Sequence, residues 1–579
     1  MKGLYQWTKK NRVVLIIFVI MTVLAALRVL AAHFRSPVYL VNGILDERLM
    51  FRYSDFSVYF AQENQNSLLK YMSFPWLLNV PSWTGLSFNS IYGLSWVLAA
   101  LAIWLPVKRC AGKYWALLAY IFVLFAPQGF DLRTCVHLYR NIIIAQSFYI
   151  LFGLMADLLL IAWEKNTKKN SITFILLQIT LALVFPFVYF IKEDSFWMMP
   201  VLYLLMAGLI AGIIVNLIKV KKTPKKIIIS VGLLLMCFLP YCSYRIAGQT
   251  YKQANQKYFN YAEYTLRTNG ELADFINKVY SIESNDRSIK VWAPYDALEK
   301  AFDASETLTN HPGLKDAVFH SPWTKEGAEE IKGDFLSWVM VTALTKDENL
   351  KTAANINAFM KDVNLELEDA FEKGILKKDD RIQLTKSAGG RTWEEVGELF
   401  EPLIAFFAQS LTFNDFSSAP VYPVKFTPDL ENYEMKLGQP LTYPTDEKGV
   451  EEMERKASIG AKIAKIDYKI YHYITPVLFV VGVISWFVVL ILTICKKIKT
   501  DPKLAIQMTL VFVLCGISVG YVIGIVWFSQ FLFVNREFAR MIDILLYYGS
   551  GGSALFYMAI LVAVPLVEKI YSKKTIEKV

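Results

Sequence analysis

The stretch of residues 13–32 reads VVLIIFVIMTVLAALRVLAA, and it decides the class of fold. It follows Lys9, Lys10 and Arg12, and its length matches the roughly 20 apolar residues with which a helix crosses a bilayer. A signal peptide would be followed by a cleavage site of small residues, and this stretch is not. Further apolar runs also come later in the chain. We therefore expect an uncleaved first membrane span.

The composition of the whole chain agrees with this expectation. Of 579 residues, 55% are hydrophobic and only 19% are charged, and the mean hydropathy is +0.35. Such values are typical of an α-helical integral membrane protein. The net charge of +10 comes from clusters in short loops between apolar runs, where lysine and arginine set topology. We therefore expect membrane lipids as partners and no nucleic acid.

About ten transmembrane helices are predicted, at residues 13–32, 88–105, 114–126, 142–163, 172–191, 197–218, 227–244, 470–495, 505–528 and 541–566. Counted from a cytoplasmic N-terminus, the inside segments are 108–113, 164–170, 219–226, 496–503 and the tail 568–579. All five are rich in lysine or arginine. The pattern predicts a multi-pass protein of the plasma membrane with both termini in the cytoplasm.

Three regions follow from this topology. Residues 1–244 form an N-terminal membrane module of seven spans, with a long first outer loop at 33–87. Residues 245–469 form an extracytoplasmic, α-rich domain, in which 355–376 has helical spacing and 289–293 reads as a short strand. Residues 470–579 form a C-terminal module of three spans and the cytoplasmic tail. No cysteine lies between residues 245 and 468, so the outer domain has no internal disulfide.

The first outer loop contains NGILDERLMFRYSDF, residues 42–56. Leu49, Tyr53 and Phe56 lie at helical spacing, which predicts an amphipathic helix on the outer leaflet. Asp46 and Glu47 precede it and allow two interpretations. Asp46 caps the helix and Glu47 favours its positive end, or a carboxylate here activates an acceptor hydroxyl or holds a divalent ion.

A second acidic cluster lies in FIKEDSFWMMP, residues 190–200, a tight turn between two predicted spans. This turn places Lys192, Glu193 and Asp194 at the outer membrane face. Two adjacent carboxylates at the membrane edge are costly unless they are paired or coordinated. The simpler interpretation is a solvated turn in which Lys192 neutralises one acid.

Basic residues occur on the same predicted side, against the usual bias of topology. Guanidinium groups suit phosphate, although ion pairs with Glu537 or Asp543 are an equally simple explanation. A single histidine such as His137 is more typical of a satisfied interfacial residue than of a ligand. The arginines concerned are Arg133 and Arg140 of DLRTCVHLYRN (131–141) and Arg536 and Arg540 of NREFARMID (535–543).

Two glycine patterns complete the set. Gly516, Gly520 and Gly524 form a small-xxx-small stripe, which is typical of close helix packing. The segment YYGSGGSALF, residues 547–556, could break the last span and line a cavity, although packing is again the simpler interpretation.

Together these features resemble the GT-C superfamily of membrane glycosyltransferases. The match consists of the acidic pair Asp46-Glu47 in a long first outer loop, followed by an amphipathic segment. The chain is also similar to a group of bacterial multi-span proteins through DERLM (46–50), YRNII (139–143), KEDSFWMMP (192–200) and GDFLSWVM (333–340). The resemblance implies a GT-C-like helical bundle with a largely helical extracytoplasmic domain.

The resemblance also implies roles for residues. The donor would be a sugar on a polyprenyl phosphate, and the acceptor a glycan, lipid or protein of the cell envelope. Asp46 would be the base, although Glu47 replaces the group's second aspartate and leaves open which carboxylate acts. Glu193 and Asp194 would form a second acidic site, with Mg²⁺ or Mn²⁺ as a cation that Asp46 helps to hold. Residues implied to bind the lipid phosphate are Arg133, Arg140, Lys192, Arg536 and Arg540.

Two other classes of function compete with the glycosyltransferase. A transporter would place charges at mid-bilayer and show an inverted repeat, and the sequence shows neither. A receptor or structural protein with a ligand-binding outer domain is opposed only by the paired acidic loops. Convergence of the acidic and basic loops on one cavity would favour the enzyme.

Overall fold

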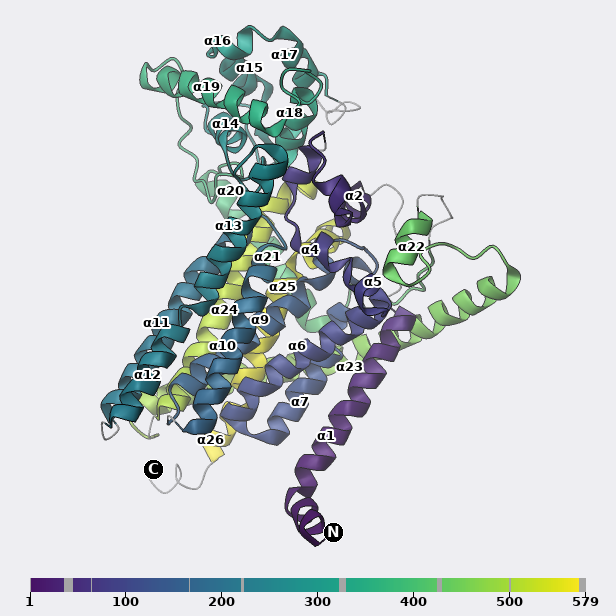
Figure 1. The fold of residues 1–579 in the computed structure, drawn as a ribbon, viewed down its shortest axis with the longest axis vertical. Coiled ribbons are helices and arrows are strands. Elements are labelled where there is room, and N and C mark those ends of the chain that lie inside the picture. Colours follow the sequence, from purple (N-terminus) through teal and green to yellow (C-terminus); the bar gives the residue numbers. More distant parts are fainter. Residues whose placement is uncertain are drawn as a thin grey trace.

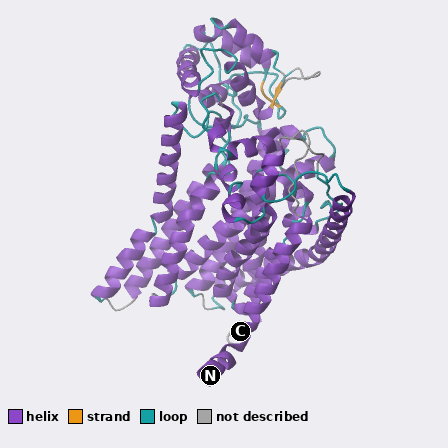
Figure 2. Ribbon diagram, turned by 45° about the vertical axis from the view of Figure 1, so that its right-hand side comes forward, coloured by secondary structure: helices purple, strands orange, loops and turns teal. Residues whose placement is uncertain are grey.

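The computed structural model describes residues 2–35, 45–63, 65–165, 167–219, 223–321, 330–423, 430–498 and 501–571. Within these ranges the side chains of 2–11, 45–47, 66 and 571 are left out. The described chain is mostly helical, and its strands are short (Figures 1 and 2).

Nine helical segments of the described chain are long and apolar enough to cross a membrane. The protein is thus an all-α membrane protein. The helices that form these segments are α1 (Lys2–Arg35), α6 (Phe88–Ala111), α9 (Ile144–Ala162), α10 (Lys168–Tyr189), α11 (Met198–Lys219), α12 (Pro224–Met236) with α13 (Leu239–Phe259), α23 (Glu447–Ile494), α24 (Pro502–Ser529) and α25 (Phe538–Ala563).

The tenth expected span, at 114–126, differs from this pattern. It forms α7 (Lys113–Leu124), a helix of 12 residues, which rises only about 18 Å. Pro127 follows closely and cannot continue the helical hydrogen bonding. The chain instead turns through η2 (Pro127–Gly129) and α8 (Leu132–Cys135) beside α6, where an added Cβ at Gly129 would lie 2.9 Å from Trp96.

The first span contains a buried arginine, although its mean hydropathy is high. Arg28 is 0% exposed, and its guanidinium lies 4.6 Å from the ring centroid of Phe130 and donates to Gly129 O at 3.3 Å. Arg35, the last residue of α1, is also buried and donates to Phe130 O and Ala419 O, each at 2.7 Å. These two arginines fasten the segment after α7 to α1.

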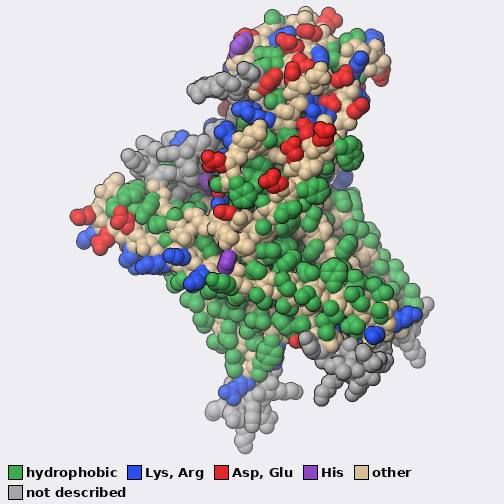
Figure 3. All heavy atoms as spheres, turned by 180° about the vertical axis from the view of Figure 1, so that it is seen from behind, with side chains coloured by type: hydrophobic (Ala, Val, Ile, Leu, Met, Phe, Trp, Pro, Cys, Tyr) green, Lys and Arg blue, Asp and Glu red, His purple; other side chains and the backbone are tan. Residues whose placement is uncertain are grey.

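Both ends of the bundle can be recognised. One end of the bundle carries the polar domain, which follows α13 in the chain. The connections from α6 to α7, α9 to α10 and α23 to α24 lie at the opposite end, as do the start of α1 and α26 (Val567–Tyr571) (Figure 1). Hydrophobic side chains cover the body between this end and the polar domain, on which Asp and Glu gather (Figure 3). The lysine-rich connections therefore share one side, as the sequence predicts.

We call residues 271–372 the head. It is built from α14 (Glu271–Val279), α15 (Tyr295–Asp303), α16 (Glu306–Thr309), α17 (Pro312–Phe319), η6 (Gly333–Phe335), α18 (Leu336–Leu344), α19 (Ala353–Glu372) and the antiparallel strands β1 (Val291–Ala293) and β2 (Ile331–Lys332). The strand predicted at 289–293 and the helix predicted at 355–376 are confirmed by β1 and α19. The predicted boundaries at 244/245 and 469/470 fall inside the continuous helices α13 and α23.

The region after the head returns to the membrane body. After α20 (Trp393–Gly397), α21 (Phe400–Thr412) packs between α23 and α25. Phe407 lies 5.0 Å from Phe556 of α25, measured between ring centroids, and Tyr557 donates to Ser410 O. Residues 400–412 therefore belong to the membrane body, although the sequence places them in the outer domain.

The first loop forms α2 (Leu45–Ser54), α3 (Phe56–Tyr59), η1 (Gln65–Leu69), α4 (Ser73–Leu77) and α5 (Val80–Thr84). The single surface helix expected after Asp46 is divided, because Asp55 caps α3. Met50, Phe51 and Tyr53 are buried, and Phe51 stacks on Tyr433 of α22 (Glu431–Leu437). Burial on several sides means that α2 packs within the protein.

Further 3₁₀ turns are η3 (Arg140–Ile143), η4 (Ser195–Trp197), η8 (Gln530–Leu532) and η9 (Val564–Leu566).

Candidate functional site

A cavity of about 740 Å³ lies at the end of the membrane body nearest the head, beside the segments that lead into and out of the head. Its walls come from the turn between α10 and α11, the upper half of α24, the segment after α13 and a loop before α20. This volume is typical of a small-molecule site. The charged residues that line it are Arg140, Lys192, Glu193, Asp194, Arg267 and Lys386.

Glu193 is held firmly at this site. Its Oε2 lies 2.5 Å from Nη1 of Arg140, and its Oε1 accepts from the Tyr71 backbone N–H at 2.8 Å. Both side chains of the ion pair are less than a tenth exposed. The pair therefore ties the first loop, the start of α9 and the α10–α11 turn together.

The same contacts decide the protonation of Glu193. Burial alone would raise its pKa, but Arg140, Lys70 and Arg267 outweigh burial and lower the pKa to about 2. A carboxylate with so low a pKa is a weak base. Glu193 is consequently suited to positioning Arg140 and not to accepting a proton.

Lys192 is the least neutralised cation of the site. Within the described ranges its ammonium group has no ion pair or hydrogen bond, and it lies 5.6 Å from the ring centroid of Tyr548. Burial, together with the positive charges of Arg140 and Lys70, lowers its pKa to about 8, although Asp194 and Glu193 oppose the shift. A bound anion would offset this buried charge.

Asp194 differs from its neighbour in being exposed and in lining the cavity. No described residue forms an ion pair or hydrogen bond with its carboxylate. The two adjacent acids therefore have different surroundings. The carboxylate of Glu193 is bound by protein groups, and the carboxylate of Asp194 is open to a ligand.

The lower wall of the cavity is apolar and follows α24. An added Cβ at Gly516, Gly520 or Gly524 would meet no atom within 4 Å, and the last two glycines line the cavity. The close helix contact predicted for this stripe is thus not formed by the described chain. Gly516 and Gly520 are exposed, so open space lies against α24 from the cavity wall outward; we call this strip of α24, along Gly516, Gly520 and Gly524, the groove.

The glycines of 547–556 behave in the opposite way. Added Cβ atoms at Gly549, Gly551 and Gly552 would come within 2.6 Å of Phe406, 2.5 Å of Phe148 and 2.5 Å of Val522, respectively. The helix α25 runs through the segment without a break. Packing is therefore the correct interpretation here, while Tyr548 alone of this segment lines the cavity among the described residues.

The upper wall is a loop closed by reciprocal backbone hydrogen bonds between Ile382 and Arg391, each 2.8 Å long. We call residues 383–390 the roof. Arg391 donates to Trp527 O at 2.7 Å and to Gln530 Oε1 at 2.5 Å, which fixes the roof to the top of α24. Residues 384–388 of the roof face the cavity.

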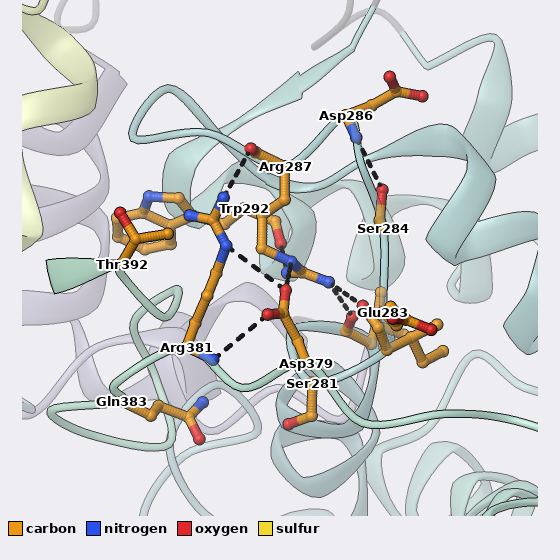
Figure 4. A network of polar contacts seen from close by, with 12 residues as sticks. Ser281, Glu283, Ser284, Asp286, Arg287, Trp292, Asp379, Arg381, Gln383 and Thr392 are labelled. Carbon is orange, nitrogen blue, oxygen red and sulfur yellow. Dashed lines mark hydrogen bonds and ion pairs between the residues drawn. The ribbon is translucent and has the colours of Figure 1, made fainter. Parts of the chain in front are cut away.

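A second set of charges supports the roof from the head side (Figure 4). Asp379 lies 3.0 Å from Arg287 and 3.4 Å from Arg381, and Arg381 pairs with Glu395 at 2.6 Å. Arg287 is anchored by donating to Ile282 O at 2.6 Å. The loop is therefore held at its base from two sides, by the ion pairs of Arg381 and by the contacts of Arg391 with α24 and η8.

Three predicted phosphate-binding arginines lie elsewhere. Arg133 pairs with Asp131 at 2.9 Å and with Asp543 at 2.7 Å. The contact with Asp543 is the ion pair that the sequence offered as an equally simple explanation. Arg536 and Arg540 are exposed. None of the three lines the described cavity, which brings together only Arg140 and Lys192 of the predicted set.

The side chains of Asp46 and Glu47 lie outside the described residues, and only their backbone, in the first turn of α2, is defined. The described residues contain no group of three His, Cys, Asp or Glu side chains that could hold a metal ion. With both oxygens of Glu193 occupied, Asp194 is the one carboxylate of the turn that remains open to a cation. The predicted divalent site stays a prediction.

Several cavity residues carry no signal in the sequence. Arg267 lines the cavity and pairs with Asp334, and Lys70 approaches Glu193 while donating to Tyr139 OH at 3.2 Å. Each is a single charge in an ordinary loop, brought to the site by long-range packing.

No protein-family model and no curated protein matches the sequence.

Proposed function

We propose that this protein is a GT-C type glycosyltransferase that moves a sugar from a polyprenyl phosphate to an acceptor of the cell envelope. One observation carries the proposal. A single cavity joins an open apolar groove on α24 to the cation Lys192 and the uncommitted carboxylate Asp194. A lipid phosphate has this combination of apolar tail and anionic head.

The groove suits the tail. Because the glycines of α24 have no neighbouring atoms within 4 Å, a hydrocarbon chain can lie against the helix backbone there. Lys192 and the Arg140–Glu193 pair then lie near the phosphate, with Lys192 as the direct ligand. The ammonium group would stabilise the negative charge that develops on the departing polyprenyl phosphate.

The transfer itself is a direct displacement. The acceptor oxygen forms a bond to the anomeric carbon, the bond from that carbon to the phosphate oxygen breaks, and the configuration inverts. A carboxylate takes the hydroxyl proton. The resemblance assigns this proton to Asp46, and among described carboxylates Asp194 is the one that is free to receive it. A divalent cation, if the enzyme uses one, would help to neutralise the phosphate.

This proposal places the head outside the cytoplasm and the lysine-rich connections inside it, at a plasma membrane of bacterial type. The polar roof and the head then provide space for the acceptor. A receptor or transporter that only binds a lipid-linked ligand would use the same groove and cation but would not need the carboxylates.

The experiment is an assay of the purified full-length chain with labelled polyprenyl-phosphate sugars. Sugar transfer, or release of polyprenyl phosphate, is expected from the wild type. Replacing Asp46 with alanine should abolish turnover while folded protein is retained. Binding of the donor without any turnover, in the presence of envelope acceptors, would favour the receptor.

A further inference from the structure

The first half of α23 forms an arm that leaves the membrane body on the side of the head (Figure 1). The arm packs against the end of the first span, because an added Cβ at Gly460 would collide with Phe34 O. The span from Arg12 to Arg35 has 24 residues and is about 36 Å long, enough to cross the hydrocarbon layer. Gly460 therefore lies near the membrane surface.

Basic residues follow one face of this arm. They occur at steps of seven, three and four residues, which places them on one side of a helix, and all four are exposed. No described carboxylate pairs with any of them, whereas Lys456, on another face, pairs with Glu452 at 2.8 Å. We call this set the basic stripe: Arg455, Lys462, Lys465 and Lys469.

The stripe continues directly into apolar surface. Ile466 is 61% exposed, Ile470 is 48% exposed and Tyr473 is 64% exposed, and all three lie on or beside the same face. Exposed aliphatic side chains at this point of a membrane-spanning helix contact lipid. Seen from behind, Lys and Arg side chains follow the edge of the arm that faces the hydrophobic body (Figure 3).

Charge is also segregated along the arm. Acidic residues outnumber basic ones in its distal turns, 447–454, where Lys448 is the one cation, and basic residues prevail in the part that approaches the lipid-facing segment, where Asp467 is buried. This arrangement is unusual for the head side, because membrane proteins place most lysine and arginine on the opposite side. An amphipathic arm with cations next to exposed apolar residues is the pattern of a helix that binds an anionic membrane surface.

We propose that the basic stripe binds the phosphate headgroups of anionic phospholipids in the leaflet next to the head. Lys462, Lys465 and Lys469 would contact the headgroups, while Ile466 and Ile470 contact the acyl chains. The binding would hold the arm and the end of α1 at the membrane surface. This inference does not depend on the proposed transferase activity.

The test measures how much phosphatidylglycerol, relative to phosphatidylcholine, the full-length chain retains through gel filtration in mild detergent. The stripe variant carries R455Q, K462Q, K465Q and K469Q. At roughly 1 kcal/mol per cation near an anionic surface, even one substitution corresponds to about a five-fold loss, so the quadruple variant should lose the preference. About 0.5 M salt should weaken the wild-type preference strongly.

The matched control removes four exposed lysines of the head and of the segment directly after it: K346Q, K361Q, K373Q and K377Q. Lys192 is intact in both variants, so binding in the cavity cancels. The control should retain the wild-type preference, and both variants should elute as folded monodisperse protein. An unchanged preference in the stripe variant, or an equal loss in both variants, would overturn the proposal.

Discussion

Nη1 of Arg140 lies 2.5 Å from Oε2 of Glu193, and this buried ion pair joins the start of α9 to the turn between α10 and α11. Both residues belong to motifs that the sequence singles out, YRNII and KEDSFWMMP. Their contact shows that two loops 53 residues apart in the chain converge on one cavity. It also gives Glu193 a structural task that the sequence did not predict.

Replacing Glu193 with glutamine should destabilise the protein by about 3–5 kcal/mol, because it leaves the buried Arg140 without its counter-ion. The measurement is the free energy of unfolding in detergent, or the shift in Tm. The control is Glu368→Gln, whose exposed carboxylate pairs with Lys278 and should cost at most about 1 kcal/mol. Equal, small effects of the two substitutions would show that the Arg140–Glu193 pair is not a structural clamp.

Binding of a lipid phosphate should depend on pH through Lys192. Its pKa of about 8 means that the ammonium group is charged below this pH and loses its proton above it. Affinity for polyprenyl phosphate should therefore fall as pH rises through about 8. The variant Lys192→Arg stays charged, so it should bind without this pH dependence, and Lys192→Met should bind weakly at every pH. A wild-type affinity that is constant from pH 7 to about 9 would contradict this role.

Asp194→Asn should leave the fold intact, because no described residue forms an ion pair or hydrogen bond with this carboxylate. Loss of its charge lowers the pKa of Lys192 further, so donor binding is compared at a pH well below 8, where Lys192 keeps its proton. If Asp194 accepts the proton or orients the acceptor, kcat should fall by about 100-fold or more while KM for the donor changes little. The assay is steady-state transfer, run beside Asp46→Ala. Full activity of Asp194→Asn with an inactive Asp46→Ala would assign the proton transfer to Asp46 alone.

The two sets of glycines should respond oppositely to larger residues. Gly520→Ala should raise the free energy of unfolding by about 0.5–1 kcal/mol, because alanine favours helix and no atom lies within 4 Å of the added Cβ. Gly520→Leu should fold but block the groove and weaken donor binding. Gly551→Leu should instead destabilise the protein by about 1–3 kcal/mol or more, because Phe148 lies 2.5 Å from the added Cβ. If Gly520→Leu binds the donor with wild-type affinity, the groove does not hold the polyprenyl chain.

Hydropathy predicted most of the fold, because a bilayer requires long apolar helices with internally satisfied backbone groups. At 114–126 it predicted a helix that α7 (Lys113–Leu124) confirms, but this helix ends before Pro127 and is shorter than the length expected of a span. It failed at 400–412, a short apolar helix in a polar context that packs against α25. Neither segment has the length by which a span is recognised.

The candidate site could be predicted only in part. The turn at 192–194 and Arg140 were found because charges next to apolar runs stand out in the sequence. Arg133 looked the same, yet it is neutralised by Asp131 and Asp543, contacts that span up to 410 residues of chain. Gly520 and Gly524 matched a packing motif, and only the neighbouring atoms distinguish a packed glycine from one that lines a groove.

The central claim is that the cavity binds a lipid phosphate with its head at Lys192 and its chain along α24. The most direct measurement is an experimental structure of the full-length chain with a short-chain polyprenyl phosphate. We predict phosphate oxygens within hydrogen-bond distance of Lys192 Nζ and isoprenoid units against Gly520 and Gly524. A phosphate bound instead at Arg536 and Arg540, with the groove empty or filled by another helix, would contradict the account.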